Sequence, residues 1–264
     1  MKFIFSIEGN IGSGKSSYVK FLKENYETIS GLQVIYLPEP VKSWEKIKDE
    51  ATGENIIEKF YKDQKKYSFA FQMMAYISRI KQLKDTLDDH DNVIIITERS
   101  VFTDKNVFAS MLREDCKMEE IEYKIYNEWF NCFTKDVKIN GIIYLNASAE
   151  VCEKRVIQRN RKGENIPLEY LKKCNQKHDD WLLNDEHTLK LNADDDWVNN
   201  ENQYTPPKNH VSETVKYIKS VISKSHMIMK AYKYGMPVPL DELRKINSDK
   251  INYSELYEAS MNGC

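Results

Sequence analysis

The sequence predicts an α/β protein with a five-stranded parallel sheet that is covered by helices on both faces. Short β-branched or aromatic runs alternate with longer helical stretches, which is typical of a sheet wrapped by helices. Residues 93–96 are continuously apolar, as expected for a strand that is buried on both faces. The chain has 264 residues, which is enough for one domain of this kind.

The predicted elements follow one another in a regular order along the chain. Runs rich in Val, Ile, Leu, Phe and Tyr predict strands at 3–8, 33–40, 92–100, 141–148 and 188–193. The longer stretches between them predict helices near 16–27, 55–88, 103–135, 149–160, 167–183 and 211–230. The second of these stretches is either one helix or two helices that divide near Lys65.

The alternation of strands and helices stops after about residue 230. Glycine and proline punctuate residues 235–239, and the chain contains no internal repeat or low-complexity segment. We therefore expect one domain over residues 1–230, followed by an appended tail over residues 231–264 that is disordered by default.

Charge and cysteine content exclude several classes of protein. Lys and Arg number 39 against 41 Asp and Glu, and a net charge of -2 gives no general attraction to nucleic acid or to an anionic membrane. The 5 cysteines are widely spaced without a CxxC pattern, so we expect reduced thiols rather than zinc ligands. No targeting signal and no apolar run of transmembrane length is found, so we expect a cytoplasmic protein.

Residues 9–16 match the phosphate-binding pattern G-x-x-x-x-G-K-[ST], and they lie between a predicted strand and a predicted helix. The backbone amides of such a loop face phosphate oxygens, its lysine bridges the outer phosphates, and its serine hydroxyl binds magnesium. A glycine-rich turn without nucleotide would not explain the Lys-Ser pair. The pattern predicts a P-loop NTPase fold that uses ATP and Mg²⁺. The residues expected around the phosphates are Gly9, Asn10, Gly12, Ser13, Gly14, Lys15, Ser16 and Ser17.

Charged side chains follow two of the predicted strands. In open α/β sheets the ligand crevice lies beyond the carboxyl ends of the strands, where Glu39, Glu98 and Arg99 are expected. A hydroxyl that attacks a γ-phosphate needs a carboxylate to accept its proton, a magnesium ion and a cation. Glu39 suits the first role, Glu98 the second and Arg99 the third. Each residue taken alone is equally well explained as a solvated charge at a strand end.

Three arginines follow the fourth strand, and two of them are spaced to share one face of a helix. Arg155, Arg159 and Arg161 suit a polyphosphate, because a guanidinium is always charged and offers forked donors. The polar residues 162–165 end at Ile166-Pro167, a pattern typical of a mobile lid. Without a phosphate loop, a solvated helix face would be the better interpretation.

These motifs together resemble the deoxynucleoside kinase family, which includes deoxycytidine, deoxyguanosine and mitochondrial thymidine kinases and a broad-specificity insect enzyme. The resemblance runs from about Phe3 to about Ile222. Its carriers are IEGNIGSGKSS at 7–17, PEPVKSW at 38–44, FAFQMMAYISR at 69–79, TERSVFTDKNVFA at 97–109 and RVIQRNRKGENIPLEYL at 155–171. The lid is one residue shorter than is usual in the family, and its acidic pair is reduced to Glu164.

The resemblance implies a role for individual residues on both substrates. On the nucleoside side, it implies Glu39 as general base, Arg99 at the 5′-oxygen, Tyr61 and Glu164 at the sugar 3′-hydroxyl, Gln72 at the base edge, and Trp44, Phe71 and Phe108 against the ring. On the ATP side, it implies Lys15 and the three lid arginines at the phosphates, Ser16 and Glu98 at magnesium, and Asp196-Trp197 in the adenine loop. It also implies a homodimer formed through helices.

The resemblance extends to the choice of base. Gln72 and Arg79 are seven positions apart, so they face the same side of a helix. Arg79 and Asp104 resemble the pair that deoxycytidine and purine kinases place over the base, where thymidine-preferring relatives have apolar residues. An Arg-Asp pair suits an amino-bearing base and leaves little room for a 5-methyl group. We therefore predict deoxycytidine, deoxyadenosine or deoxyguanosine over thymidine. The alternative is an ordinary surface ion pair.

Two other functions fit parts of this pattern. A nucleoside monophosphate kinase such as thymidylate kinase shares the phosphate loop and the lid, but a carboxylate base such as Glu39 suits a neutral hydroxyl better than a dianion. A non-catalytic nucleotide-binding subunit on the same fold is the second alternative. The catalytic residues are all intact, which argues against a subunit that has lost activity: Lys15, Ser16, Glu39, Glu98 and Arg99.

Overall fold

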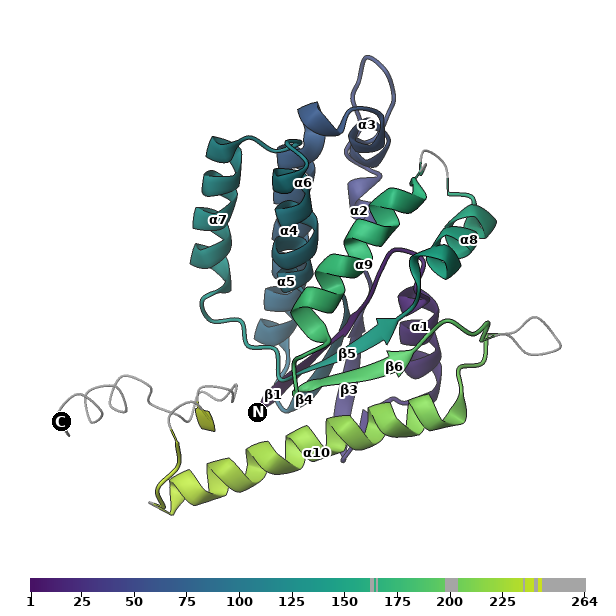
Figure 1. Ribbon diagram of the computed structural model, residues 1–264. Helices are drawn as coiled ribbons and strands as arrows, with labels where there is room; N and C mark the ends of the chain where they lie inside the picture. The colour runs from purple at the N-terminus through teal and green to yellow at the C-terminus, as the bar shows by residue number, and fades with distance from the viewer. Residues whose placement is uncertain (162–163, 165, 198–203, 235, 240–241, 244–264) are drawn as a thin grey trace.

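A single sheet forms the centre of the molecule (Figure 1). The computed structural model describes residues 1–161, 164, 166–197, 204–234, 236–239 and 242–243. Within these residues the sheet has 6 strands in the order β2-β3-β4-β1-β5-β6. Their bounds are β1 Lys2–Glu8, β2 Thr28–Ile29, β3 Leu32–Leu37, β4 Val93–Glu98, β5 Gly141–Asn146 and β6 Thr188–Asn192.

The expected parallel α/β sheet is confirmed, except that it has one strand more than expected. The five predicted strands pair in parallel, with β1 between β4 and β5, whereas the edge strand β2 pairs antiparallel to β3. Thr28 and Ile29 alone form β2, and two residues carry no periodic signal that a sequence could reveal. Because β1 and β4 are adjacent and parallel, the phosphate loop after Glu8 and the charged turn after Glu98 leave the sheet side by side.

Helices cover both faces of the sheet (Figure 1). Their bounds are α1 Lys15–Asn25, α2 Val41–Trp44, α3 Ile56–Lys62, α4 Gln64–Asp89, α5 Val101–Thr103, η1 Asp104–Ala109, α6 Ser110–Glu114, α7 Glu120–Thr134, α8 Ala149–Arg159, α9 Leu168–Leu182 and α10 Lys208–Lys233. The predicted helix at 103–135 is wrong in one respect, because it divides into α5-η1-α6 and α7. Between them Cys116 has a left-handed backbone with φ 54. The stretch 55–88 forms two helices that meet at Asp63.

Alternate residues of the central strands pack into two separate cores. Phe3, Phe5 and Ile7 of β1 pack with residues of α1 and α10, while Ile4 packs on the opposite face with residues of α4, α6 and α7. Every residue of β4 is buried, as its continuous apolar character predicts. Each fully buried Ile or Phe side chain contributes about 1.5–3 kcal/mol to folding. The strand ends that carry the charged residues are therefore held on a rigid support.

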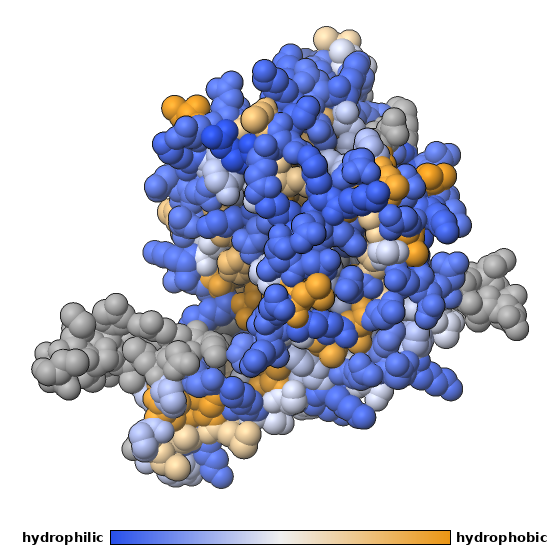
Figure 2. Space-filling view, in the orientation of Figure 1, coloured by the Kyte–Doolittle hydropathy of each residue, from blue (hydrophilic) through white to orange (hydrophobic). Residues whose placement is uncertain are grey.

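The surface is largely hydrophilic on the face drawn in Figure 2, with hydrophobic side chains gathered beside the C-terminal end of α10. Among the described residues, none of the helices has both the length and the apolar character needed to cross a membrane. Cys116, Cys132, Cys152 and Cys174 are free thiols, and Cys264 lies outside the described residues. The helix α10 ends at Lys233. The division into a domain over 1–230 and a tail over 231–264 stays a prediction.

Candidate active site

The phosphate loop connects β1 to α1 in a backbone shape that requires glycine. A Cβ atom on Gly9, which has φ 147, would lie 2.6 Å from the carbonyl oxygen of Leu145 and 2.6 Å from Ser13 Oγ. Gly14 has φ 94 and is the residue that precedes the first turn of α1. The loop therefore presents backbone amides and a helix N-terminus at one point, which is an arrangement suited to an anion.

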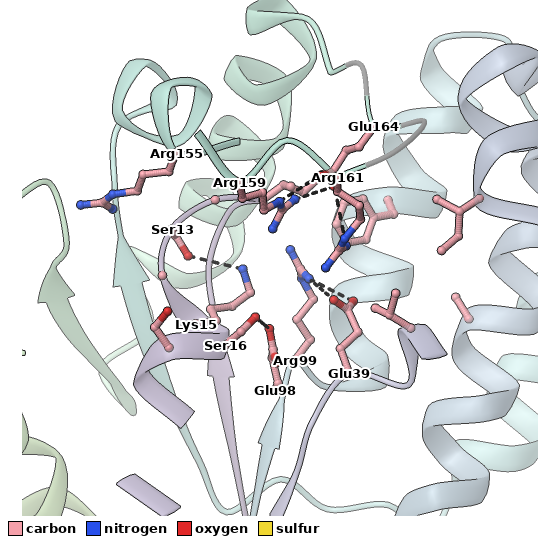
Figure 3. A pocket seen from close by; sticks show the side chains of 18 of the residues that line it. Ser13, Lys15, Ser16, Glu39, Glu98, Arg99, Arg155, Arg159, Arg161 and Glu164 are labelled. Carbon is pink, nitrogen blue, oxygen red and sulfur yellow. Dashed lines mark hydrogen bonds and ion pairs between the residues drawn. The ribbon is translucent and has the colours of Figure 1, made fainter. Parts of the chain in front are cut away.

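Lys15 is buried within this loop. Its Nζ atom donates to the carbonyl oxygen of Asn10 at 2.5 Å and to Ser13 Oγ at 3.4 Å (Figure 3). Burial, followed by the charge of Arg99, lowers the pKa of Lys15 from 10.5 to about 7. The negative charge of a bound triphosphate would favour the protonated form of this side chain.

The first turn of α1 meets the end of β4 beside the loop. Ser16 Oγ donates to Glu98 Oε1 at 2.5 Å (Figure 3). A hydroxyl and a carboxylate beside a phosphate site fit magnesium, which keeps several waters and takes its remaining ligands from phosphates. The described residues contain no group of three or more His, Cys, Asp or Glu side chains that could hold a metal ion alone. A nucleotide-dependent site is therefore the only kind of magnesium site that this pair supports.

Two arginines hold the carboxylate of Glu39. Arg99 Nη1 donates to both oxygens at 3.0 and 3.2 Å (Figure 3). Arg79 Nη2 donates to Oε1. Burial alone would raise the pKa of Glu39, but Arg99 and Arg79 together hold it well below its usual range. Glu39 is thus ionised at neutral pH in the ligand-free protein and is able to accept a hydrogen bond from a hydroxyl.

Arg79 also contacts Asp104, with Nε at 3.1 Å from Oδ2. The two side chains are 6% and 2% exposed, so this is not a surface ion pair. Burial raises the pKa of Asp104 to about 6, although the charge of Arg79 acts in the opposite direction. Arg79 lies 5.3 Å from the centre of the Trp44 ring and donates to the backbone oxygen of Glu98 at 3.2 Å. One guanidinium therefore joins the charged turn to the aromatic wall of the cavity.

Aromatic side chains form that wall. Phe71 stacks on Phe60 with ring centres 4.5 Å apart and meets Trp44 edge-on at 5.7 Å. Gln72 lines the same cavity, and its buried Oε1 atom has no hydrogen-bond partner among the described residues. Phe108 also lines the cavity, and its ring centre lies 5.3 Å from the guanidinium of Arg99. An apolar slot with one unpaired amide at its side suits a planar base.

The lid arginines are held by their own acidic residue. Glu164 accepts from Arg159 Nε at 2.8 Å and from Arg159 Nη2 at 2.5 Å, and it lies 3.9 Å from Arg161 (Figure 3). Tyr61 lines the cavity with them, and its pKa is raised, first by burial and then by the charge of Glu164. Residues 162, 163 and 165 lie outside the described residues. The predicted partners for a sugar hydroxyl are thus near one another, with Glu164 already bound by arginine.

Arg155 points away from the other two arginines (Figure 3). Its guanidinium donates to the backbone oxygens of Ala193 at 2.8 Å and Asp195 at 2.7 Å, and it lies 3.5 Å from Asp196. The structure therefore places Arg155 against the loop expected to hold adenine rather than over the phosphate loop. Residues 198–203 of that loop lie outside the described residues.

A cavity of about 450 Å³ contains nearly all of the predicted site residues. The members that line it are Gly12, Ser13, Gly14, Lys15, Ser16, Ser17, Glu39, Trp44, Tyr61, Phe71, Gln72, Arg79, Glu98, Arg99, Asp104, Phe108, Arg155, Arg159, Arg161, Glu164, Asp196 and Trp197. Gly9 and Asn10 are absent from this lining. Asn10 instead donates through Nδ2 to the backbone oxygen of Leu171 at 2.9 Å, so its side chain joins the loop to α9.

Sequence reasoning missed several residues that line the cavity or support it. Tyr170 on α9 and Tyr204 line the cavity; Tyr170 lies within the lid motif but was given no role, and Tyr204 lies in no motif. Phe60 was also missed, although it directly precedes Tyr61, to which the resemblance assigns a contact with the sugar. Glu8, at the end of β1, is fully buried, and its carboxyl group accepts two hydrogen bonds from the turn that follows β4.

Comparisons with known proteins agree with this geometry. A family model described as deoxynucleoside kinase matches residues 5–216. A probable deoxycytidine kinase of Fowlpox virus is 37% identical over 207 residues, covering 75% of this chain and 82% of the relative. Human deoxycytidine kinase is 38% identical over 212 residues, covering 72% and 78%. A mitochondrial deoxyguanosine kinase of Xenopus laevis is 31% identical over 224 residues, covering 74% and 83%.

Proposed function

Because the chain belongs to the deoxynucleoside kinase family and is an ATP-dependent kinase, we propose that it phosphorylates the 5′-hydroxyl of deoxycytidine, deoxyadenosine or deoxyguanosine. The observation that carries this proposal is one cavity in which the phosphate loop and Lys15 face the carboxylate of Glu39. A phosphoryl group can pass between a donor and an acceptor only when both are held in such a shared site.

The reaction requires the sugar hydroxyl to lie in line with the γ-phosphate. Glu39 orients the hydroxyl and accepts its proton, and Arg99 stabilises the charge that develops on the oxygen. A strongly acidic carboxylate is a weak base, but the transition state of phosphoryl transfer is loose and places little demand on basicity. Lys15 and the lid arginines stabilise the charge on the transferred group. Magnesium would be held by Ser16 and Glu98, and it supplies further neutralisation of the phosphates.

The base preference follows from the pair of Arg79 and Asp104. A buried guanidinium beside a carboxylate offers donors and an acceptor to an amino-bearing base, and Gln72 has an unpaired carbonyl oxygen in the same wall. A 5-methyl group would have to displace one of these polar groups without forming a new hydrogen bond. The names of the relatives, two deoxycytidine kinases and a deoxyguanosine kinase, support the same preference.

A panel of substrates tests this function. Purified protein is supplied with labelled ATP and each of the four deoxynucleosides, and in parallel with the corresponding monophosphates. We expect transfer to nucleosides only, with kcat/KM lowest for thymidine. Preferential transfer to monophosphates would show a thymidylate-type kinase instead, and ATP binding without any turnover would show a non-catalytic subunit. If kcat/KM is higher for thymidine than for the other three nucleosides, the proposed base preference is wrong but the kinase function stands.

Glu39→Gln tests the role of the carboxylate. The amide preserves the size of the side chain but cannot accept the proton, so we expect kcat to fall by roughly a hundredfold or more. The affinity for ATP should stay within about twofold, because Glu39 lies on the acceptor side. Glu45→Gln changes an exposed glutamate of the same segment and is the matched control. Unchanged turnover in Glu39→Gln would remove Glu39 from this role.

The proposal includes a cytoplasmic homodimer that contacts neither nucleic acid nor a membrane. Support for the dimer comes from an exposed apolar stripe on α7 with i, i+4 spacing, which we call the α7 stripe. Its members and their exposed fractions are Ile121 65%, Ile125 41%, Trp129 48% and Phe133 38%. A stripe of this kind on a helix is typical of a helix–helix interface between subunits. The four free thiols agree with a reducing compartment.

A further inference from the structure

Glu8 is a fully buried carboxylate that has no role in the reaction described above. Its Oε1 atom accepts the backbone N–H of Ser100 at 2.8 Å, and its Oε2 atom accepts the hydroxyl of Thr103. No ion pair to Glu8 is found in the described part of the chain. A buried carboxyl group is costly unless its oxygens are hydrogen-bonded, so these two contacts hold the side chain in place.

The two hydrogen-bond donors, Ser100 and Thr103, belong to the segment that carries the charged residues of the proposed nucleoside site. Arg99 directly precedes Ser100, and Asp104 directly follows Thr103. Arg99 has a left-handed backbone with φ 61, a conformation that a residue with a side chain adopts only when its surroundings impose it. Its N–H donates to the backbone oxygen of Ile7 at 3.0 Å. Adjacent residues of β1 therefore fix both sides of this turn.

Glu8 is also the last residue of β1, and Gly9 of the phosphate loop follows it directly. Glu8 is thus joined by the chain to the phosphate loop, where ATP is proposed to bind. Its two hydrogen bonds join it to the turn that faces the proposed nucleoside site. Arg99 Nη2 lies 3.5 Å from the backbone oxygen of Gly9, so the two sites meet at this point.

We propose that Glu8 is a positioning residue, whose carboxylate fixes the turn bearing Arg99 and Asp104 at the in-line distance from the phosphate loop. This inference rests on the proposed kinase function. In-line transfer is sensitive to distance, because a displacement of about 1 Å can cost roughly a hundredfold in rate. Loss of the contact should therefore lower kcat more than it raises KM, since each substrate still has its own binding groups.

Thr103→Val is the principal test, because it removes the hydroxyl group and preserves the size of a fully buried side chain. We expect kcat to fall by roughly tenfold, with KM for ATP and for deoxycytidine within about threefold of the original. Thr103→Ser restores the hydroxyl and should restore kcat to within about threefold. Glu8→Gln can still accept from Ser100 and donate to Thr103, so its kcat should lie between those of the two threonine variants.

Thr214→Val on α10 is the matched control. It also removes a fully buried hydroxyl, whose partner is the hydroxyl of Tyr18 at 2.7 Å, but it lies outside the cavity lining. We expect it to lower Tm as Thr103→Val does while leaving kcat unchanged.

Two outcomes would overturn the inference. One is that both valine variants lose the same amount of Tm and keep full kcat, and the other is that Thr103→Ser fails to restore kcat. If Thr103→Val does not fold, Thr103→Ala, which also removes the hydroxyl group, takes its place, and full kcat in Thr103→Ala overturns the inference. An inactive original protein would instead contradict the proposed function.

Discussion

Four side chains at the centre of the cavity balance one another in charge. Glu39 and Asp104 are acidic, Arg79 and Arg99 are basic, and Arg79 contacts both acids. Because all four are largely buried, the loss of any one leaves a partner without compensation. Two arginines hold Glu39 ionised, whereas burial raises the pKa of Asp104 to about 6 because the charge of Arg79 only partly opposes it.

Asp104→Asn should change the dependence of stability on pH. Burial raises the pKa of Asp104 from 3.8 to about 6, so the folded state binds its proton more tightly than the unfolded state does. Stability from this group is therefore fully present below about pH 4 and is lost as the pH rises through 6. Asparagine does not titrate. The unfolding free energy of the variant minus that of the original protein should therefore increase by about 1–2 kcal/mol when the pH is raised from 5 to 7.5.

Urea unfolding at the two pH values measures this difference. Asp88→Asn, at an exposed position of α4, is the control and should show the same difference at both pH values. A constant difference for Asp104→Asn would mean that the carboxylate is ionised equally easily in the folded and unfolded states.

Among the elements, the lid carries a contact that can be tested directly. Glu164 is 4% exposed and holds Arg159 and Arg161 over the cavity. Glu164→Gln removes the charge that orders them, so we expect kcat/KM for ATP to fall by roughly tenfold. The preference for a nucleoside with a 3′-hydroxyl over its 3′-deoxy analogue should also narrow if Glu164 contacts the sugar. Glu169→Gln, an exposed position of α9, should change neither quantity. Equal kinetics in both variants would contradict the prediction for the lid.

The central strands and most helices could be predicted because their signals are local. Continuous apolar runs predicted β1, β4 and β5, and the structure confirms them. The break between α6 and α7 was missed because no glycine or proline marks it, and the left-handed residue there is Cys116. The π-helix η1 was missed for a similar reason, because no periodic signal in residues 104–109 distinguishes its wider turn from an α-helix.

The composition of the cavity could be predicted where a spacing or a motif was visible. Gln72 and Arg79 were placed on one side of a helix from their spacing, and both line the cavity. Tyr170 could not be found in this way, because only the packing of α9 over the cavity shows that it faces inward. Asn10 lies within a phosphate-binding motif, yet its side chain turns to α9. A motif thus fixes the backbone of a loop more securely than it fixes each side chain.

For the molecule as a whole, the C-terminal boundary can be tested by truncation. Leu243 is buried against Ile228, Met229, Tyr232 and Val238, so the described chain after α10 folds back onto that helix. A protein that ends at Leu243 should keep its kcat and its Tm. A protein that ends at Lys233 loses this cluster, and we expect Tm to fall by a few degrees with kcat retained. Loss of kcat in the longer form would show that residues 244–264 take part in the activity.

The proposed homodimer can be tested at the α7 stripe. Trp129 and Phe133 stack with ring centres 5.7 Å apart on its surface, and Ile77 of the neighbouring α4 is 41% exposed. Burial of these side chains in a subunit interface would contribute about 1.5–3 kcal/mol for each large residue. Trp129→Glu should therefore convert a dimer into a monomer in sedimentation velocity, because a buried unpaired carboxylate opposes association. Met227→Glu changes a residue of α10 that is 65% exposed and should leave the dimer intact. A monomeric original protein would contradict the proposed homodimer. A dimer that survives Trp129→Glu and dissociates in Met227→Glu would place the interface elsewhere.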